Sequence, residues 1–318
     1  MVDACSDTAA DGRPTGAEAA AVVYGAPPAE LAEVPPGAVQ VSPLAPGGAP
    51  LETLAPASLE RAVVAAPPGA VERRYVLACV LRALRPGAAL TVLAPKDKGG
   101  ARLAKELEAF GCAVAETSRR HQRICHAVRP EAPTGLEAAI AAGALQYSDA
   151  LGLWTQPGVF SWDRPDPGTQ RLLAALPAFA GRGADLGCGL GVLARGVLAS
   201  AEVTRLDLVD IDYRAIAAAR RNVADPRARF HWADARVAPE LAGLDFVVMN
   251  PPFHDQGVEA RRLGLAFIRR ARQVLRQGGA LWLVANRHLP YEAALRELFA
   301  QVTPRGEDGG FKIYEARA

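Results

Sequence analysis

Cysteine and long apolar runs are scarce in this chain, and each scarcity excludes a class of protein. Five of its 318 residues are cysteines, and no two of them form a Cys-x-x-Cys pair. This pattern excludes a disulfide framework and a cysteine-based zinc site, so we expect reduced thiols and no metal. No run reaches 18 apolar residues, and residues 1–20 lack a basic start followed by an apolar stretch. We therefore expect neither a membrane span nor a signal peptide.

The remaining composition is that of a globular protein, which we expect to be cytoplasmic. Half of the residues are hydrophobic and 22% are charged, as in ordinary folded domains. The length predicts two domains. The formal net charge is +2, and the positive excess lies in residues 151–318. So small an excess does not distinguish a surface that binds polyanions from ordinary solvated charge.

The second half of the chain alternates short apolar strands with helices. We expect strands at residues 183–186, 205–210, 229–232, 244–249, 280–285 and 311–316, and helices at 192–200, 213–223 and 259–275. Strands separated by helices of this length predict βαβ units and a parallel sheet, which is the α/β class.

The first half repeats this rhythm more weakly. Strands are expected at residues 38–41, 61–65, 89–93 and 124–128, and helices at 71–84 and 100–110. Each half also contains a helix that runs into a similar segment, Leu84-Arg-Pro-Gly-Ala-Ala-Leu90 or Leu275-Arg-Gln-Gly-Gly-Ala-Leu281, and then a strand. This similarity predicts two copies of one fold, over residues 1–150 and 151–318, joined near residues 146–154.

A glycine loop, Asp185-Leu-Gly-Cys-Gly-Leu-Gly191, lies at one predicted strand-to-helix turn. Gly187, Gly189 and Gly191 have no Cβ, so the backbone there can turn sharply and approach a ligand. Open α/β sheets bind ligands at the carboxyl ends of their strands. A dinucleotide-binding loop would need glycine where Val192 stands. The spacing after Asp185 instead favours S-adenosylmethionine, although a glycine run alone is weak evidence in a chain with 30 glycines.

Acidic residues follow the next two predicted strands. Asp210 ends one of them and can accept hydrogen bonds from both ribose hydroxyls of the cofactor, and Asp212 is the alternative. Asp234 follows the third strand and can accept from the adenine amino group, with Ala235 giving a backbone contact. The competing interpretation of Asp234 is a helix N-cap.

The segment Asn250-Pro-Pro-Phe-His254 directly follows an apolar strand. Its prolines stiffen the loop and remove backbone donors. An exocyclic amine could donate to the Asn250 side-chain oxygen and to the Pro251 carbonyl, which would aim its lone pair at the methyl donor without a strong base. Phe253 could stack on a planar acceptor, a contact of about 1–3 kcal/mol per base. The alternative is a proline-rich turn with Phe253 in the core. Pro252 and His254 are candidate substrate contacts, and a structural role for His254 is equally open.

Together these motifs resemble the RsmC and RlmG group of bacterial ribosomal RNA guanine-N2 methyltransferases. The resemblance is carried by the glycine loop, Asp210, the Asn250–His254 segment and the segments Gly158-Val-Phe-Ser161, Val284-Ala-Asn286, Leu289-Pro-Tyr291 and Phe311-Lys-Ile-Tyr314. It implies two tandem Rossmann-like methyltransferase domains: a degenerate first one and a seven-stranded class I second one that binds S-adenosylmethionine. The first half fits, because no Gly-x-Gly-x-Gly follows residues 22–24 and no Asn-Pro-Pro-Phe follows residues 91–93.

The resemblance also implies an activity and a partner. It implies S-adenosylmethionine-dependent methylation of the exocyclic N2 of a guanine in 16S ribosomal RNA, by a monomer that acts on ribosomal RNA or the small ribosomal subunit. The first domain would then support folding and hold RNA, with Lys96, Lys98 and Arg123 as phosphate contacts rather than ordinary solvated side chains. The alternatives are a guanine in 23S ribosomal RNA, a protein glutamine amide, and a non-catalytic RNA-binding assembly factor that keeps the fold.

Overall fold

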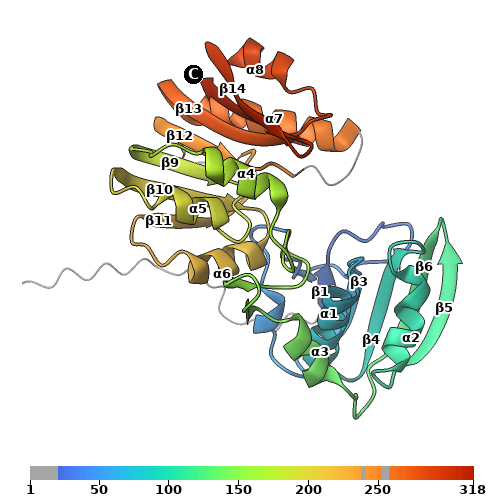
Figure 1. Ribbon diagram of the computed structural model, residues 1–318. Helices are drawn as coiled ribbons and strands as arrows, with labels where there is room; N and C mark the ends of the chain where they lie inside the picture. Colours follow the sequence, from blue (N-terminus) through green and yellow to red (C-terminus); the bar gives the residue numbers. More distant parts are fainter. Residues whose placement is uncertain (1–20, 238–240, 253–257) are drawn as a thin grey trace, which may run out of the picture.

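The computed structural model describes residues 21–237, 241–252 and 258–318, which form two α/β domains joined by a short connecting segment (Figure 1). The first domain has a six-stranded sheet in the order β2-β1-β3-β4-β6-β5. Its strands are β1 (Ala21–Tyr24), β2 (Val39–Gln40), β3 (Leu59–Ala65), β4 (Leu84–Pro95), β5 (Ala113–Arg119) and β6 (Gln122–Val128). Its helices are α1 (Ala70–Ala83), α2 (Leu103–Glu108) and α3 (Leu136–Gly143), with short 3-10 turns at Leu51–Thr53 and Gly100–Arg102.

The second domain has a seven-stranded sheet in the order β11-β10-β9-β12-β13-β15-β14. Its strands are β9 (Gly181–Leu186), β10 (Val203–Asp210), β11 (Ala228–Trp232), β12 (Leu244–Met249), β13 (Leu275–Asn286), β14 (Gln301–Asp308) and β15 (Phe311–Arg317). Its helices are α4 (Pro167–Ala175), α5 (Val192–Val197), α6 (Tyr213–Asn222), α7 (Val258–Val274) and α8 (Glu292–Leu298). A small hairpin, β7 (Gln146–Ser148) and β8 (Leu153–Thr155), precedes it, and the predicted division after residue 150 falls in its turn.

The two sheets share one topology. Strands β3, β4, β5 and β6 take the places that β12, β13, β14 and β15 hold in the second sheet, with the same parallel and antiparallel pairings. A shift in strand register also occurs at equivalent places in the two sheets. It follows the pair Leu59–Leu84 in the first sheet and the pair Leu244–Leu275 in the second. Among the described residues the first sheet lacks a counterpart of β11. This arrangement confirms the predicted fold of tandem domains with a seven-stranded second sheet.

Both faces of the second sheet are buried, which explains its nearly continuous apolar strands. Along β12, Val247 packs with Phe267 and Ile268 of α7 on one face, whereas Val248 packs with Leu172 of α4 on the other. Alternate residues of a strand point to opposite faces, so one strand serves two cores. The first domain has a core of its own around α1 and α3.

Four of the five cysteines lie in the part of the chain that the structure describes. Cys79, Cys112, Cys125 and Cys188 are buried and unpaired, whereas Cys5 lies outside the described residues. Within the described ranges, none of the helices combines the length and the apolar character needed to cross a membrane.

Several elements are absent from the sequence-based expectations, and α4 matters most for function. Its first residue is Pro167, and its N-cap is Asp166, whose carboxylate accepts a hydrogen bond from the Thr169 N–H at 2.6 Å. An N-cap aspartate followed by proline is a recognised helix start, so the sequence held this signal. The exposed strands β5 and β14 were not predicted because their side chains are mostly polar. Helices α3 and α8 were not predicted because they are short.

Candidate active site

Three neighbouring strands of the second sheet end at one level and bring together residues that are distant in sequence. Asp185 of β9 lies opposite residue 208 of β10 on one side and residue 248 of β12 on the other. Two residues further on, Gly187, Asp210 and Asn250 therefore lie side by side at the carboxyl edge. The chain order reverses here, because β10 and β12 flank β9 on opposite sides. Such a switch point is where open α/β sheets bind ligands.

The glycine loop is folded tightly against β10. Gly187 and Gly191 have φ angles of 78° and 80°, a left-handed conformation that side chains strongly disfavour. A Cβ on Gly191 would also lie 2.8 Å from the side chain of Val223. The Gly187 N–H donates to the Val209 carbonyl at 2.8 Å. These contacts fix the loop as a cradle at the start of α5.

Asp185, two residues before the first glycine of this loop, has a fully buried carboxyl group without a hydrogen-bond partner among the described residues. Burial, reinforced by the nearby Asp210, raises its pKa to about 8. The nearby backbone N–H of Ala194 opposes this rise in pKa, although it lies outside hydrogen-bond geometry. A buried carboxyl group without a partner suits a site that receives positive charge.

Two adjoining cavities open on the loop. The larger has a volume of about 810 Å³ and the smaller about 450 Å³. Phe160, Gly187, Gly189 and Asn250 line both of them. These volumes lie within the usual range of roughly 300–1,000 Å³ for cofactor and ligand sites. Asn250 therefore stands where the two spaces meet.

The structure separates Asp210 from Asp212, the two candidates for the ribose contact. Asp210 lines the larger cavity. Its two carboxylate oxygens accept from the N–H groups of Gly189 and Asp212, at 2.8 and 2.9 Å. Burial raises its pKa to about 6, although these bonds oppose the rise. Asp212 instead caps helix α6 by accepting from the Arg214 N–H at 2.9 Å. The geometry thus leaves Asp210 as the acid that faces the cavity.

Asp234 and Ala235 also line the larger cavity. The Asp234 carboxylate accepts from the backbone N–H and the guanidinium of Arg236, and this ion pair lowers its pKa. Residues 235–237 form a turn rather than a helix, so Asp234 is not a helix N-cap in this segment. An adenine amino group at Asp234 would share the carboxylate with Arg236.

Asn250 lines both cavities and is followed by two prolines. The Asn250 Nδ2 donates to Asp166 Oδ2 and to Thr169 Oγ1, both at 2.8 Å. Pro251 is buried and Pro252 is exposed at the larger cavity. Phe253 and His254, the expected stacking and substrate contacts, lie outside the described residues.

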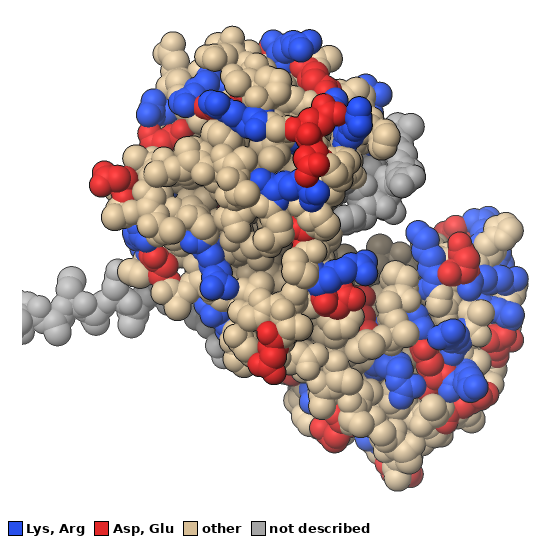
Figure 2. Space-filling view, in the orientation of Figure 1, with Lys and Arg blue, Asp and Glu red and all other residues tan. Residues whose placement is uncertain are grey.

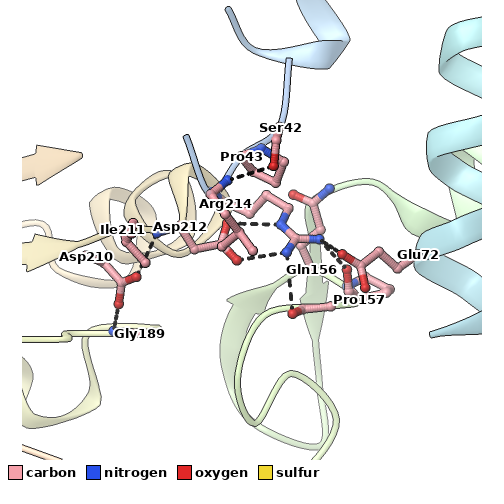
Figure 3. Close-up of polar contacts among 12 residues, drawn as sticks. Ser42, Pro43, Glu72, Gln156, Pro157, Gly189, Asp210, Ile211, Asp212 and Arg214 are labelled. Carbon is pink, nitrogen blue, oxygen red and sulfur yellow. Dashed lines mark hydrogen bonds and ion pairs between the residues drawn. The ribbon is translucent and has the colours of Figure 1, made fainter. Parts of the chain in front are cut away.

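The first domain docks near the glycine loop through a buried ion-pair cluster (Figure 3). Arg214 of α6 donates to Glu72 of α1 at 2.6 Å and to both oxygens of Asp212 at 3.0 and 2.8 Å. It also donates to the carbonyls of Pro157 and Gly158. Burial raises the pKa of Glu72, although Arg214 opposes the rise. Because the Asp212 N–H donates to Asp210, the cluster links the docked domain to the acid that lines the larger cavity.

The basic residues expected to contact phosphates lie on the first domain, away from the cavities. Lys96 and Lys98 are exposed in the turn after β4, whereas Arg123 is half-buried and paired with Glu116 at 2.5 Å. Sequence reasoning missed Arg262 and Arg269, which are exposed on α7 and line the larger cavity. Their seven-residue spacing puts them on one helix face, a signal that the sequence does carry.

The second domain matches a known family model. Residues 150–315 match the "Methyltransferase small domain" family. The chain is 31% identical over 252 residues to the ribosomal RNA small subunit methyltransferase C of Shewanella loihica, covering 76% of this chain and 72% of that protein. It is 38% identical over 174 residues to the ribosomal RNA large subunit methyltransferase G of Pseudomonas putida, covering 53% of this chain and 46% of that protein.

A solved structure shares the two-domain fold. The chain matches the T. thermophilus 16S rRNA N2 methyltransferase RsmC, solved in complex with AdoMet and guanosine, with a TM-score of 0.71 and 24% identity. That match covers 84% of this chain and 75% of the RsmC chain. The alignment with the Pseudomonas protein spans about half the length of that relative. With the family match and the site geometry together, the chain belongs to the methyltransferase small domain family and is a class I S-adenosylmethionine-dependent methyltransferase of the RsmC and RlmG type.

Proposed function

We propose that this chain methylates the exocyclic N2 of a guanine in 16S ribosomal RNA. The observation that carries the proposal is the position of Asn250, which directly follows β12 at the level of the glycine loop and lines both cavities. A cofactor held by Asp185, Gly187, Gly189 and neighbouring residues would thus have an amide oxygen beside it. That arrangement suits transfer to an amine.

S-adenosylmethionine would supply an activated methyl group on a sulfonium. The chain's own residues then need to position the acceptor, because no strong base is required for such a transfer. The Asn250 Oδ1 and the Pro251 carbonyl would each accept one amine N–H, so that the nitrogen lone pair points at the methyl group. Phe253 would stack on the base, and the surplus amine proton would pass to solvent after transfer.

Basic side chains near the site support a nucleic-acid acceptor. Arg262 and Arg269 stand at the larger cavity, and within the described part of the chain neither forms an ion pair with a carboxylate. Figure 2 shows further Lys and Arg side chains on the first domain, across a hollow from the second. Lys96 and Lys98 are exposed on that domain. Arginine and lysine at such positions would hold phosphates and fix the register of the RNA.

The relatives favour ribosomal RNA and, within it, the small subunit. The match that covers three quarters of this chain is named a small subunit methyltransferase. Our proposal therefore includes ribosomal RNA or the small subunit as partner, a cytoplasmic location, and an RNA-holding role for residues 1–150. The target base must leave its stack to reach Asn250, at a cost of a few kcal/mol.

Mass spectrometry of ribosomal RNA nucleosides tests the proposal. Cells that lack this protein should lose one N2-methylguanosine from 16S RNA, and the purified protein should restore it in vitro. Loss from 23S RNA would move the substrate to the large subunit, and loss of methylglutamine from a protein would replace RNA altogether. An unchanged set of modifications together with no binding of S-adenosylmethionine would support a non-catalytic assembly factor.

Asn250→Ala tests the residue role. Removing a transition-state hydrogen bond should lower turnover about 100- to 1,000-fold, while the dissociation constant for S-adenosylmethionine stays nearly the same. Asn286→Ala is a matched control, because Asn286 ends the next strand, β13, and lies outside both cavity linings. An equal loss of cofactor binding in Asn250→Ala would contradict its role at the acceptor.

A further inference from the structure

The amide of Asn250 is held by two acceptors on helix α4, which comes more than 80 residues earlier in the chain. Its Nδ2 donates to Asp166 Oδ2 and to Thr169 Oγ1, each at 2.8 Å. The same Asp166 oxygen accepts the Thr169 N–H at 2.6 Å. Both N–H groups of the Asn250 amide are therefore engaged on one side.

This pairing decides which way the amide faces. A carboxylate can accept hydrogen bonds but cannot donate them, so the Asn250 nitrogen must point to Asp166 and its oxygen must point away. An acceptor amine also needs that oxygen, because an amine N–H and an amide N–H are both donors. In the rotated amide, the Asn250 oxygen would face the Asp166 carboxylate, and the amide N–H groups would face the amine, so the bond to Asp166 and the bond to the amine would be lost together.

The two acceptors are held firmly in place. Asp166 caps the helix that it starts, and such caps are worth about 1 kcal/mol. Leu172 of the same helix is fully buried in the core beneath the sheet. Gly168 packs so closely that a Cβ there would lie 2.9 Å from the ring of Phe311. Helix α4 thus cannot shift easily, and its acceptors stay fixed relative to β12.

We infer that Asp166 and Thr169 are positioning residues for methyl transfer. Asp166, which can only accept, selects the amide rotation of Asn250 that presents its oxygen to the acceptor amine, and Thr169 holds the second amide N–H in that rotation. This inference rests on the proposed amine-binding role of Asn250. The two residues also line the smaller cavity. A purely ligand-binding role for them would raise the KM or a dissociation constant, whereas a positioning role lowers kcat.

Paired variants of α4 test the inference. Thr169→Val removes one acceptor with little change of shape, and Thr169→Ser restores the hydroxyl. Asp166→Ser keeps an N-cap residue but shortens the side chain, and Asp166→Asn keeps an accepting oxygen at full length. We expect kcat to fall about 10-fold in each disruptive single variant and about 100-fold in the double variant. The KM for RNA and the dissociation constant for S-adenosylmethionine should stay within about two-fold. Thr169→Ser and Asp166→Asn should keep kcat near the wild-type value, unlike Thr169→Val and Asp166→Ser.

A second readout needs no substrate. The side-chain amide protons of Asn250, assigned in the NMR spectrum by their loss in Asn250→Ala, should exchange slowly with water in the wild type and quickly in the double variant. Unchanged kcat and unchanged exchange in a folded double variant would overturn the inference. If the wild type methylates no amine while its Asn250 amide is still protected, the proposed function fails and the bonding to α4 stands.

Discussion

Asp185→Asn tests whether a buried carboxyl group is kept for the cofactor at the expense of the stability of the free protein. The pKa of Asp185 is raised from 3.8 to about 8, first by burial and then by Asp210. Between these pH values the folded protein therefore binds more protons than the unfolded chain. The stability of the cofactor-free protein should be fully present below about pH 4 and should be lost as the pH rises towards about 8.

The magnitude follows from the shift. Each pH unit in this window is worth about 1.4 kcal/mol, so the interval from pH 5 to pH 8 amounts to at most about 4 kcal/mol. Asparagine cannot ionise and removes this dependence, although its own unpaired amide costs about 1–3 kcal/mol. Between pH 5 and pH 8 the free energy of unfolding of the wild type should therefore fall by about 2–4 kcal/mol more than that of Asp185→Asn.

Urea denaturation without cofactor, at pH 5, 6.5 and 8, measures this difference. All four tryptophans follow residue 153, so their fluorescence reports on the second domain. Asp245→Asn is the control: its carboxylate pairs with Arg276 and has a lowered pKa, so its effect should be constant above pH 5. Parallel pH dependence in the wild type and Asp185→Asn would refute the reasoning. Calorimetry in buffers of different ionisation heat should also show proton release when the wild type binds S-adenosylmethionine at pH 7.

Three further predictions concern the cofactor, the domain interface and RNA. Asp210→Ala should weaken S-adenosylmethionine binding at least about 10-fold by the loss of charged hydrogen bonds, and an unchanged dissociation constant would contradict its ribose contact. Arg214→Leu leaves two buried carboxylates facing each other and should cost about 3–5 kcal/mol in urea unfolding, whereas Glu72→Gln keeps a hydrogen bond and should cost about 1 kcal/mol. Equal losses of unfolding free energy in Arg214→Leu and Glu72→Gln would contradict the stabilising role of this ion-pair cluster. Arg262→Gln with Arg269→Gln should lower the salt dependence of RNA affinity by about one unit of slope per phosphate contact, and an unchanged slope would place the RNA elsewhere.

Much of the fold could be predicted from the sequence, because short segments of the second domain each indicate the strand, turn or helix that they form. The apolar run of β12 and the Gly-x-Gly-x-Gly turn after β9 each follow from composition over a few residues, as does the amphipathic pattern of α7. The internal repeat at Leu84 and Leu275 also predicted a second copy, since similar segments face similar packing demands. Edge strands such as β14 were missed because an exposed strand needs no apolar alternation.

Part of the candidate site could be predicted from the sequence for the same reason. Asp185 and Asp210 lie at the carboxyl ends of β9 and β10, and Asn250 directly follows β12. The carboxyl edge of a parallel sheet brings such strand ends together. Asp166 and Thr169 carried a helix-start signal but nothing that linked them to Asn250. Their bonds join residues more than 80 positions apart and depend on where α4 packs.

The sequence by itself determined the tandem α/β architecture, the cofactor class and the position of Asn250, because glycine geometry, proline stiffness and strand periodicity act over short distances. Tertiary structure alone decided that Asp210 and not Asp212 faces the cavity, that Arg214 ties the first domain to the cofactor edge, and which way the Asn250 amide turns. Each of these depends on a hydrogen-bond partner brought in by packing, and one-dimensional spacing does not encode such a partner.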